Sequence, residues 1–134
     1  MKHLKTVLLS MGLIALIALA GCGHSGVDAN DLSGVYVRSF EGEFSVGIDT
    51  LKLVKRENGS DEPDQYTIQR TLAYQKIIDG EMQVDTLYKH QSWRGMYDPE
   101  HQILKIRPSG KALTVDKERQ EISLGEGIYH KIKE

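Results

Sequence analysis

The stretch QYTIQRTLAY, residues 65–74, alternates between two kinds of side chain with a period of two. One set comprises Tyr66, Ile68, Arg70, Leu72 and Tyr74, and the other comprises Thr67, Gln69 and Thr71. Alternate residues of an extended chain point to opposite faces of a sheet, whereas an amphipathic helix repeats every 3.6 residues. The stretch therefore predicts a β-strand with one largely apolar face.

Similar patterns recur along the chain. Further strands are predicted at residues 34–40, 49–56, 82–90, 93–97, 103–107, 112–116, 121–124 and 128–132. Asn58-Gly59 and Asp79-Gly80 supply the positive φ angles that tight hairpin turns need. No segment of helical length after residue 31 has a convincing amphipathic period. We therefore predict an all-β fold, an antiparallel meander of eight or nine short strands that closes as a small barrel or a curled sandwich.

The N-terminal residues have the composition of a secretory signal. Residues 1–5 carry two lysines and no acid, and an apolar run follows over residues 7–20. The run is shorter than the roughly 20 apolar residues that a membrane-spanning helix needs. A short membrane anchor and a buried helix are the alternatives.

Residues 19–22 identify the type of signal. Leu19, Ala20, Gly21 and Cys22, the only cysteine, resemble the lipobox of bacterial lipoproteins. The resemblance implies that the signal helix is cut off before Cys22 and that Cys22 is acylated. A mature bacterial lipoprotein carries three acyl chains, and two already hold a protein stably on a membrane, at about 0.8 kcal/mol per buried methylene. The expected membrane contact is therefore a lipid anchor at Cys22.

The residues around Cys22 predict the location and the domains. Gly23 instead of Asp follows Cys22, and no acidic run follows directly, so the known inner-membrane and surface-export signals are absent. By analogy to these sorting rules we expect an outer-membrane protein that faces the periplasm. The predicted parts are a signal peptide (residues 1–21), a lipidated cysteine with a flexible tether (22–31) and one all-β domain (32–134). Loss of the signal changes the net charge from −2 to −4, which gives no electrostatic reason to bind nucleic acid.

The start of the first predicted strand shows a second resemblance. Gly34-Val35-Tyr36 resembles the Gly-x-Trp signature of the lipocalin and calycin barrels. In those barrels the aromatic ring packs at the closed end, under a basic residue of the last strand. The resemblance implies these roles for Tyr36 and for Lys131 or Lys133. The domain as a whole resembles small lipocalin-like lipoproteins of Bacteroidota-type bacteria.

Arg70 is the strongest candidate for a ligand contact. It shares a predicted strand face with Tyr66 and Tyr74, and a cation inside a barrel needs a carboxylate or an anionic ligand. One interpretation is an anion-binding pocket floored by Arg70, with the hydroxyls of Tyr66, Tyr74 and Tyr88 as donors. In the alternatives, Arg70 pairs with an internal acid such as Glu43, or its face is turned outward.

Other residue types give weaker hypotheses. The histidines that follow Cys22 are His24, His90, His101 and His130, and none of them has the spacing of metal ligands. We therefore expect no metal and no cofactor. The tripeptide Asp-Thr-Leu occurs around Thr50 and Thr86 and resembles the O-glycosylation site of Bacteroidota-type bacteria, with chance as the alternative.

The functional prediction follows from these features. No catalytic serine elbow, zinc-protease motif, phosphate loop or catalytic cysteine is present, so we expect no enzyme. The predicted function is a binding module for an envelope protein or a small amphipathic ligand. The alternative is an inhibitor or accessory factor for an envelope enzyme or a secretion machine, which would insert a loop such as residues 40–47. A hydrolase with an unrecognised site is a third hypothesis.

Overall fold

The computed structural model describes residues 31–57, 59 and 61–132. The predicted signal peptide, the lipobox and His24 lie outside the described residues, as do Asn58 and Lys133. The described part contains nine strands and no helix, so no helix in it is a candidate for crossing a membrane.

Every strand pairing is antiparallel. The strands are β1 (Gly34–Glu41), β2 (Ser45–Arg56), β3 (Gln65–Ile78), β4 (Glu81–Met82), β5 (Leu87–Asp98), β6 (Ile103–Arg107), β7 (Ala112–Asp116), β8 (Glu121–Leu124) and β9 (Gly127–Lys131). Eight of them form a ring in chain order, which closes where β9 pairs with β1, and β4 is an extra strand on the end of β3. The prediction of an all-β meander is confirmed, and it closes as a barrel.

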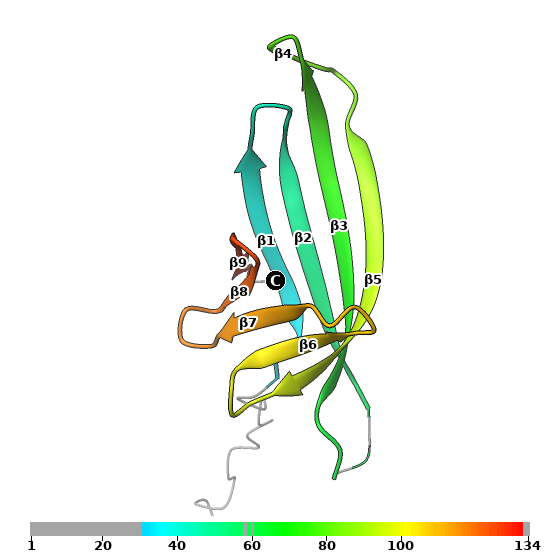
Figure 1. Ribbon diagram of the computed structural model, residues 1–134, viewed down its shortest axis with the longest axis vertical. Helices are drawn as coiled ribbons and strands as arrows, with labels where there is room; N and C mark the ends of the chain where they lie inside the picture. The colour runs from blue at the N-terminus through cyan, green and yellow to red at the C-terminus, as the bar shows by residue number, and fades with distance from the viewer. Residues whose placement is uncertain (1–30, 58, 60, 133–134) are drawn as a thin grey trace, which may run out of the picture.

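The two sides of the barrel differ in height (Figure 1). Strands β2, β3 and β5 have 12–14 residues each, whereas β6 to β9 have only four or five. Along β5, only residues 94–98 pair with β6. Along β1, only Tyr36 and Val37 pair with β9. The upper parts of β1, β2, β3 and β5 therefore rise above the ring as a four-stranded sheet. We call this sheet the wall.

The lower part of the barrel is filled by side chains. The core consists of Leu32, Tyr36, Leu51, Leu53, Tyr66, Ile68, Tyr97, Leu104, Ile106, Leu113, Val115, Ile122 and Tyr129. An eight-stranded barrel has an interior just wide enough for such side chains. Gly95 shows how tightly they pack, since a Cβ atom there would lie 3.0 Å from both Ile68 and Leu104. The core side chains therefore fill the interior at this level.

Residues 31–33 seal the lower end of the barrel. The Leu32 N–H donates a hydrogen bond to the Tyr66 hydroxyl oxygen (3.0 Å), and the Tyr36 hydroxyl donates to the Leu32 carbonyl (2.9 Å). Burial raises the pKa of both tyrosines to about 12. We call this sealed end the closed end.

A lysine of the last strand lies against the closed end. The Lys131 ammonium is 5.8 Å from the centre of the Tyr36 ring, a cation–π contact. Gly34 has a φ of 146°, and a side chain there would run into Lys131. This is the contact that the calycin resemblance implies for Tyr36 and Lys131, while membership of that family stays a prediction.

The strand limits differ from the prediction in several places. Strand β2 begins at Ser45 and not at residue 49, and β3 ends at Ile78 and not at residue 74. The largest difference lies around β5. We predicted separate strands at residues 82–90 and 93–97, but β5 runs without a break from Leu87 to Asp98, and residues 83–86 belong to no strand. The residues between the two predicted strands are Gln91 and Ser92, which are polar. They lie in the exposed part of β5, where a strand needs no apolar side chains. The turn at Asp79-Gly80 is confirmed, with φ angles of 51° and 78°.

Candidate functional site

A polar layer lies on top of the filled core. Asp49 of β2 is 0% exposed, and its carboxylate accepts hydrogen bonds from Arg70 of β3 and Tyr129 of β9. The Arg70 Nε donates to the two carboxylate oxygens at 2.9 and 3.1 Å, and the Tyr129 hydroxyl donates to Oδ2 at 2.7 Å. The Arg70 Nη2 also donates to Oδ2, so four hydrogen bonds from two strands satisfy the buried carboxylate.

The same contacts shift the pKa values of both partners. The hydrogen bonds that Arg70 donates to Asp49 raise the pKa of Arg70, so its guanidinium stays charged. Burial, and then the hydrogen bond to Asp49, raise the pKa of the Tyr129 hydroxyl to about 12. At neutral pH the Arg70 guanidinium is therefore charged and the Tyr129 phenol is neutral.

Arg38 brings a second guanidinium to this level. Cross-strand pairing with Asp49 puts Arg38 on the inner face of β1, where it lies 5.6 Å from the Tyr129 ring centre and 5.8 Å from that of Phe40. Its Nε is buried and has no hydrogen-bond partner in the part of the chain that the structure describes. A side chain on Gly127 would collide with the Arg38 guanidinium, so the glycine makes room for it. Among the described residues, no carboxylate pairs with Arg38.

A groove of about 450 Å³ opens above the polar layer on the inner face of the wall. Its lining residues are Arg70, Leu72, Lys89, His90 and Gln91. The Lys89 ammonium lies 5.5 Å from the centre of the Tyr74 ring, and no acid in the described part of the chain pairs with it. The groove therefore combines apolar surface with cations, which suits an anionic group attached to an apolar one.

The structure separates the four residues predicted to form one pocket. Arg70 and Tyr74 share the inner face of β3 as expected. Tyr66 lies on the same face but deep in the core at the closed end, where its hydroxyl contacts Leu32. Tyr88 pairs with Ala73 and lies on the outer face, where it is 64% exposed. As a correction, Tyr66 and Tyr88 do not line the groove. Tyr66 lies too deep in the barrel, and Tyr88 occupies a position of β5 whose side chain points outward.

The internal acid is also a different one from the residue suggested. Arg70 pairs with Asp49 and not with Glu43, which lies exposed in the turn between β1 and β2. A signal for Asp49 was present in the sequence, because it alternates with Leu51 and Leu53 and so shares their buried face. Arg38 alternates with Tyr36 and Phe40 in the same way. In all three cases a charged residue continues an apolar strand face, although only Arg70 was predicted from this pattern.

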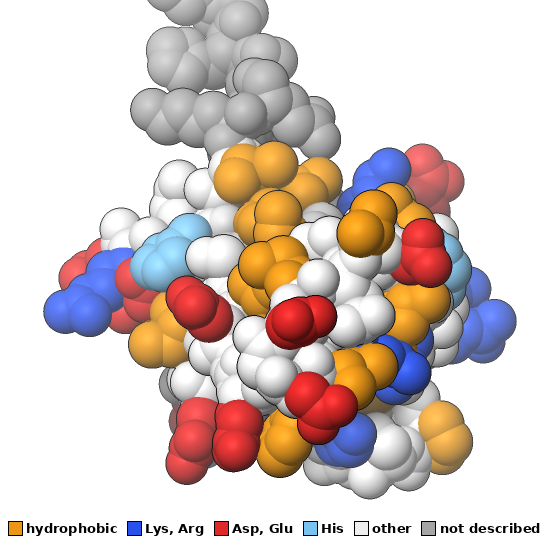
Figure 2. Space-filling model, turned by 90° about the horizontal axis from the view of Figure 1, so that it is seen from above, with side chains coloured by type: hydrophobic (Ala, Val, Ile, Leu, Met, Phe, Trp, Pro, Cys, Tyr) orange, Lys and Arg blue, Asp and Glu red, His pale blue; other side chains and the backbone are white. Residues whose placement is uncertain are grey.

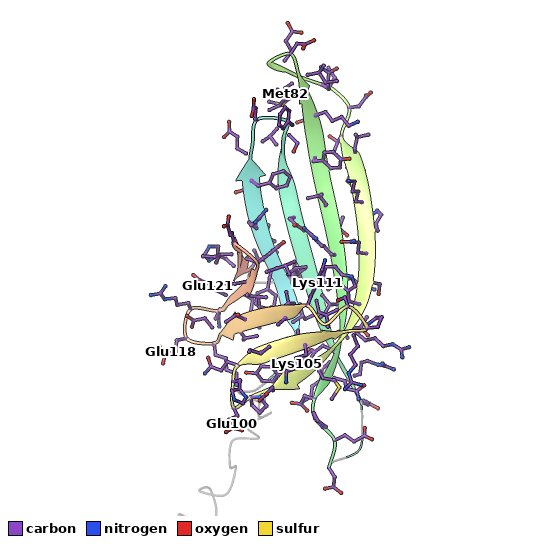
Figure 3. All side chains as sticks on the ribbon, in the orientation of Figure 1. Met82, Glu100, Lys105, Lys111, Glu118 and Glu121 are labelled. Carbon is purple, nitrogen blue, oxygen red and sulfur yellow. The ribbon has the colours of Figure 1, made fainter. Side chains whose placement is uncertain are left out.

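The upper end of the wall forms a second exposed feature, which we call the tip. Its apolar side chains are Phe44, Ile78, Met82 and Val84, and its acids are Glu41, Glu43, Asp79, Glu81 and Asp85. Seen from above, hydrophobic side chains gather across this end with acidic ones among them (Figure 2). Met82 lies at this upper end, far from Lys105 and Glu100 at the lower end (Figure 3). The inner face of the wall is thus basic, whereas its tip is acidic.

A larger groove, of about 600 Å³, lies near the tip between β1, β2, β3 and the connection before β5. The Gln75 side chain holds this connection, since its amide donates to the carbonyls of Gln83 (3.2 Å) and Val84 (3.3 Å). Thr86 lines the groove, and Thr50 lies half-buried in β2. Glycosylation of Thr50 or Thr86 stays a prediction.

The described histidines lie apart from one another. His101 contacts Asp98 at 2.9 Å, His130 lies 3.4 Å from Glu121, and His90 contacts the Thr71 hydroxyl at 3.3 Å. Within residues 31–57, 59 and 61–132, no group of three potential ligands could hold a metal ion.

Comparisons with known proteins do not assign this chain to a family. No family model, no curated protein and no solved structure matches it. The fold and the groove are therefore the basis for a functional proposal.

Proposed function

We propose that this protein is a lipoprotein of the outer membrane whose barrel is a non-enzymatic binding module in the cell envelope. The observation that carries the proposal is the groove of about 450 Å³ above the filled core, with Arg70, Leu72 and Lys89 in its lining. A solvent-open groove with apolar and cationic groups suits binding of an envelope protein or a small amphipathic ligand. The lipid at Cys22 would concentrate the module at the membrane.

The position of the chain entry supports a particular orientation. Asp31 and Leu32 lie at the closed end, and the wall extends to the opposite end of the molecule (Figure 1). Residues 23–31 can span at most about 30 Å when extended. In the proposed arrangement the closed end stays near the membrane and the groove opens away from it.

The anchor is tested in the parent strain. We expect the native protein to take up radiolabelled palmitate and to fractionate with the outer membrane, and we expect Cys22→Ser to lose both properties. A native protein that carries no label, or a Cys22→Ser variant that still fractionates with lipid, would overturn the anchor.

The small-ligand version is tested by thermal shift on the intact protein in detergent. Palmitate, haem and muropeptides form the panel, since any compound that binds the folded state raises the melting temperature by mass action. We expect an amphipathic anion to raise it and Lys89→Glu to reduce that shift, with Lys52→Glu on β2 as the control. A flat response to the whole panel would exclude a small ligand.

The alternative function, an inhibitor or accessory factor, has one specific observation in its favour. Phe44, in the turn between β1 and β2, is 73% exposed and lies within the loop proposed for insertion. A photo-crosslinking residue at position 44 should capture an envelope enzyme or a secretion component in the parent cells, whereas one at position 52 should not. Equal capture at both positions would contradict insertion of this loop.

A further inference from the structure

The wall has an open edge along the upper part of β5. Residues 87–93 pair with β3 on one side, and β6 begins its pairing only at Arg94. No other described strand pairs with these residues on the second side (Figure 1). In an antiparallel ladder about half of the N–H and C=O groups point to each side, so this edge offers unpaired backbone groups to a partner.

We propose that this edge binds an extended, acidic segment of another protein by strand addition. The proposal rests on the binding function above, and it names the class of partner for the same groove. Main-chain hydrogen bonds along residues 87–93 would supply affinity. Side chains of the added strand that face inward would enter the groove beside Lys89 and supply specificity.

The charges on the inner face favour an acidic segment. The charged groups that face the groove and the layer below it are Arg38 on β1, Asp49 on β2, Arg70 on β3 and Lys89 on β5. Asp49 is already occupied by Arg70, and Lys76 continues the basic face further up β3. A carboxylate on the added strand would lie beside Lys89, which has no acidic partner among the described residues.

A second copy of this chain fits the edge poorly. Antiparallel pairing of two β5 edges would place the two closed ends at opposite ends of the pair. Both copies carry the proposed anchor close to the closed end, so they could not sit in one membrane face in this arrangement. Two basic inner faces, each with Lys89 at its edge, would also repel one another.

The test uses the full protein in dodecyl maltoside and labelled peptides of nine residues. The first peptide alternates threonine and valine around a central glutamate, the second has lysine at the centre, and the third is the glutamate peptide with every second amide N-methylated. By fluorescence anisotropy we expect the glutamate peptide to bind about fivefold more tightly than the lysine peptide, the scale of one exposed ion pair. We expect N-methylation on the pairing side to weaken binding about tenfold, because it removes main-chain hydrogen bonds.

Protein variants make the result specific to the edge. Lys89→Glu should reverse the preference in favour of the lysine peptide, and Lys52→Glu, on the outer face of β2, should leave it unchanged. Hydrogen exchange should show new protection of the amides of residues 87–93 when the glutamate peptide is bound. Equal binding of all three peptides, no reversal in Lys89→Glu, or protection confined to another strand would each overturn the proposal. These outcomes do not depend on palmitate labelling, so they separate failure of strand addition from failure of the anchor.

Discussion

The closed end and the wall share strands β1, β2, β3 and β5 but differ in how their side chains pack. At the closed end, side chains from all eight strands of the ring meet, and residues such as Leu51 and Ile122 are 0% exposed. In the wall only β1, β2, β3 and β5 contribute, and the side opposite them is open. Inward-facing residues there, such as Leu72 and Lys89, stay partly or fully exposed. The two parts of the same strands therefore have different roles. The ring stabilises the fold, and the wall offers the surface proposed for binding.

The polar layer marks the boundary between the two regions. Below Asp49 the inner face of β2 continues with Leu51 and Leu53, and above Asp49 the next inward position is Gly47, within the wall. Tyr129 reaches this level from the short strand β9 and closes the layer over the core. The following changes compare the two regions in terms of the free energy of unfolding.

Replacing Asp49 should have the largest effect. In Asp49→Ala the Arg70 guanidinium loses its carboxylate and the Tyr129 hydroxyl loses its acceptor, which we expect to cost about 4 kcal/mol. Urea unfolding can be followed through the fluorescence of Trp93, the only tryptophan, which lies 5.9 Å from the Arg70 guanidinium. Asp49→Asn keeps an acceptor oxygen, so its free energy of unfolding should lie between those of Asp49→Ala and the native protein. A cost below about 1 kcal/mol for Asp49→Ala would show that the layer does not support the barrel.

A matched pair of leucines compares the regions directly. Leu51→Ala removes a side chain that is 0% exposed, and such cavities cost about 3 kcal/mol. Leu72→Ala changes a half-buried residue on the inner face of the wall, where water can fill the space, so we expect about 1 kcal/mol or less. Urea midpoints of the two variants measure the difference. Equal losses would mean that the wall is packed as tightly as the ring.

Local patterns predicted the strands well, for a physical reason. Whether side chains alternate along residues 65–74 depends only on neighbouring positions, and the short strands β6, β7 and β8 were predicted with the limits that the structure has. Turn chemistry at Asp79-Gly80 is equally local. These features follow from sequence without knowledge of which strands meet.

Contacts between distant strands could not be predicted in this way. Asp49 and Tyr129 meet only because β9 closes the ring, a partnership across 80 residues that no local spacing encodes. The height of the wall depends on where β6 and β9 stop pairing, which again is a property of the assembled barrel. Tyr88 was placed in the pocket from its residue type, although its place in the ladder directs it outward.

Alkaline pH should weaken the ring through its buried tyrosines. The pKa values of Tyr36, Tyr66 and Tyr129 are raised from 10.0 to about 12, so the folded state keeps protons that the unfolded state has released. Their contribution to stability is present below pH 10 and is lost as the pH rises towards about 12. Tyr66→Phe should cost about 1 kcal/mol at pH 7, because the Leu32 N–H loses its acceptor.

The pH profile of this variant provides the control. Between pH 10 and about 12, each such tyrosine contributes up to about 1.4 kcal/mol per pH unit to the decrease in the free energy of unfolding. The free energy of Tyr66→Phe should therefore decrease less steeply with pH than that of the native protein. Urea unfolding at pH 9 to 12 measures both proteins. An identical slope in the two would contradict the raised pKa of Tyr66.

The smallest effect is expected on the outer face of the wall, at Tyr88. Its side chain is 64% exposed, and its ring stacks on His90, with the ring centres 6.4 Å apart, on a surface that no other described strand covers. Tyr88→Ser should change the free energy of unfolding by less than about 0.5 kcal/mol, as exposed substitutions usually do. Tyr66→Ser at the closed end is the matched change, and it should be several times more costly because it empties part of the core. If Tyr88→Ser lost more than about 1 kcal/mol, the outer face of the wall would have to be a packed surface, and the division of the barrel into a stabilising ring and an open wall would fail.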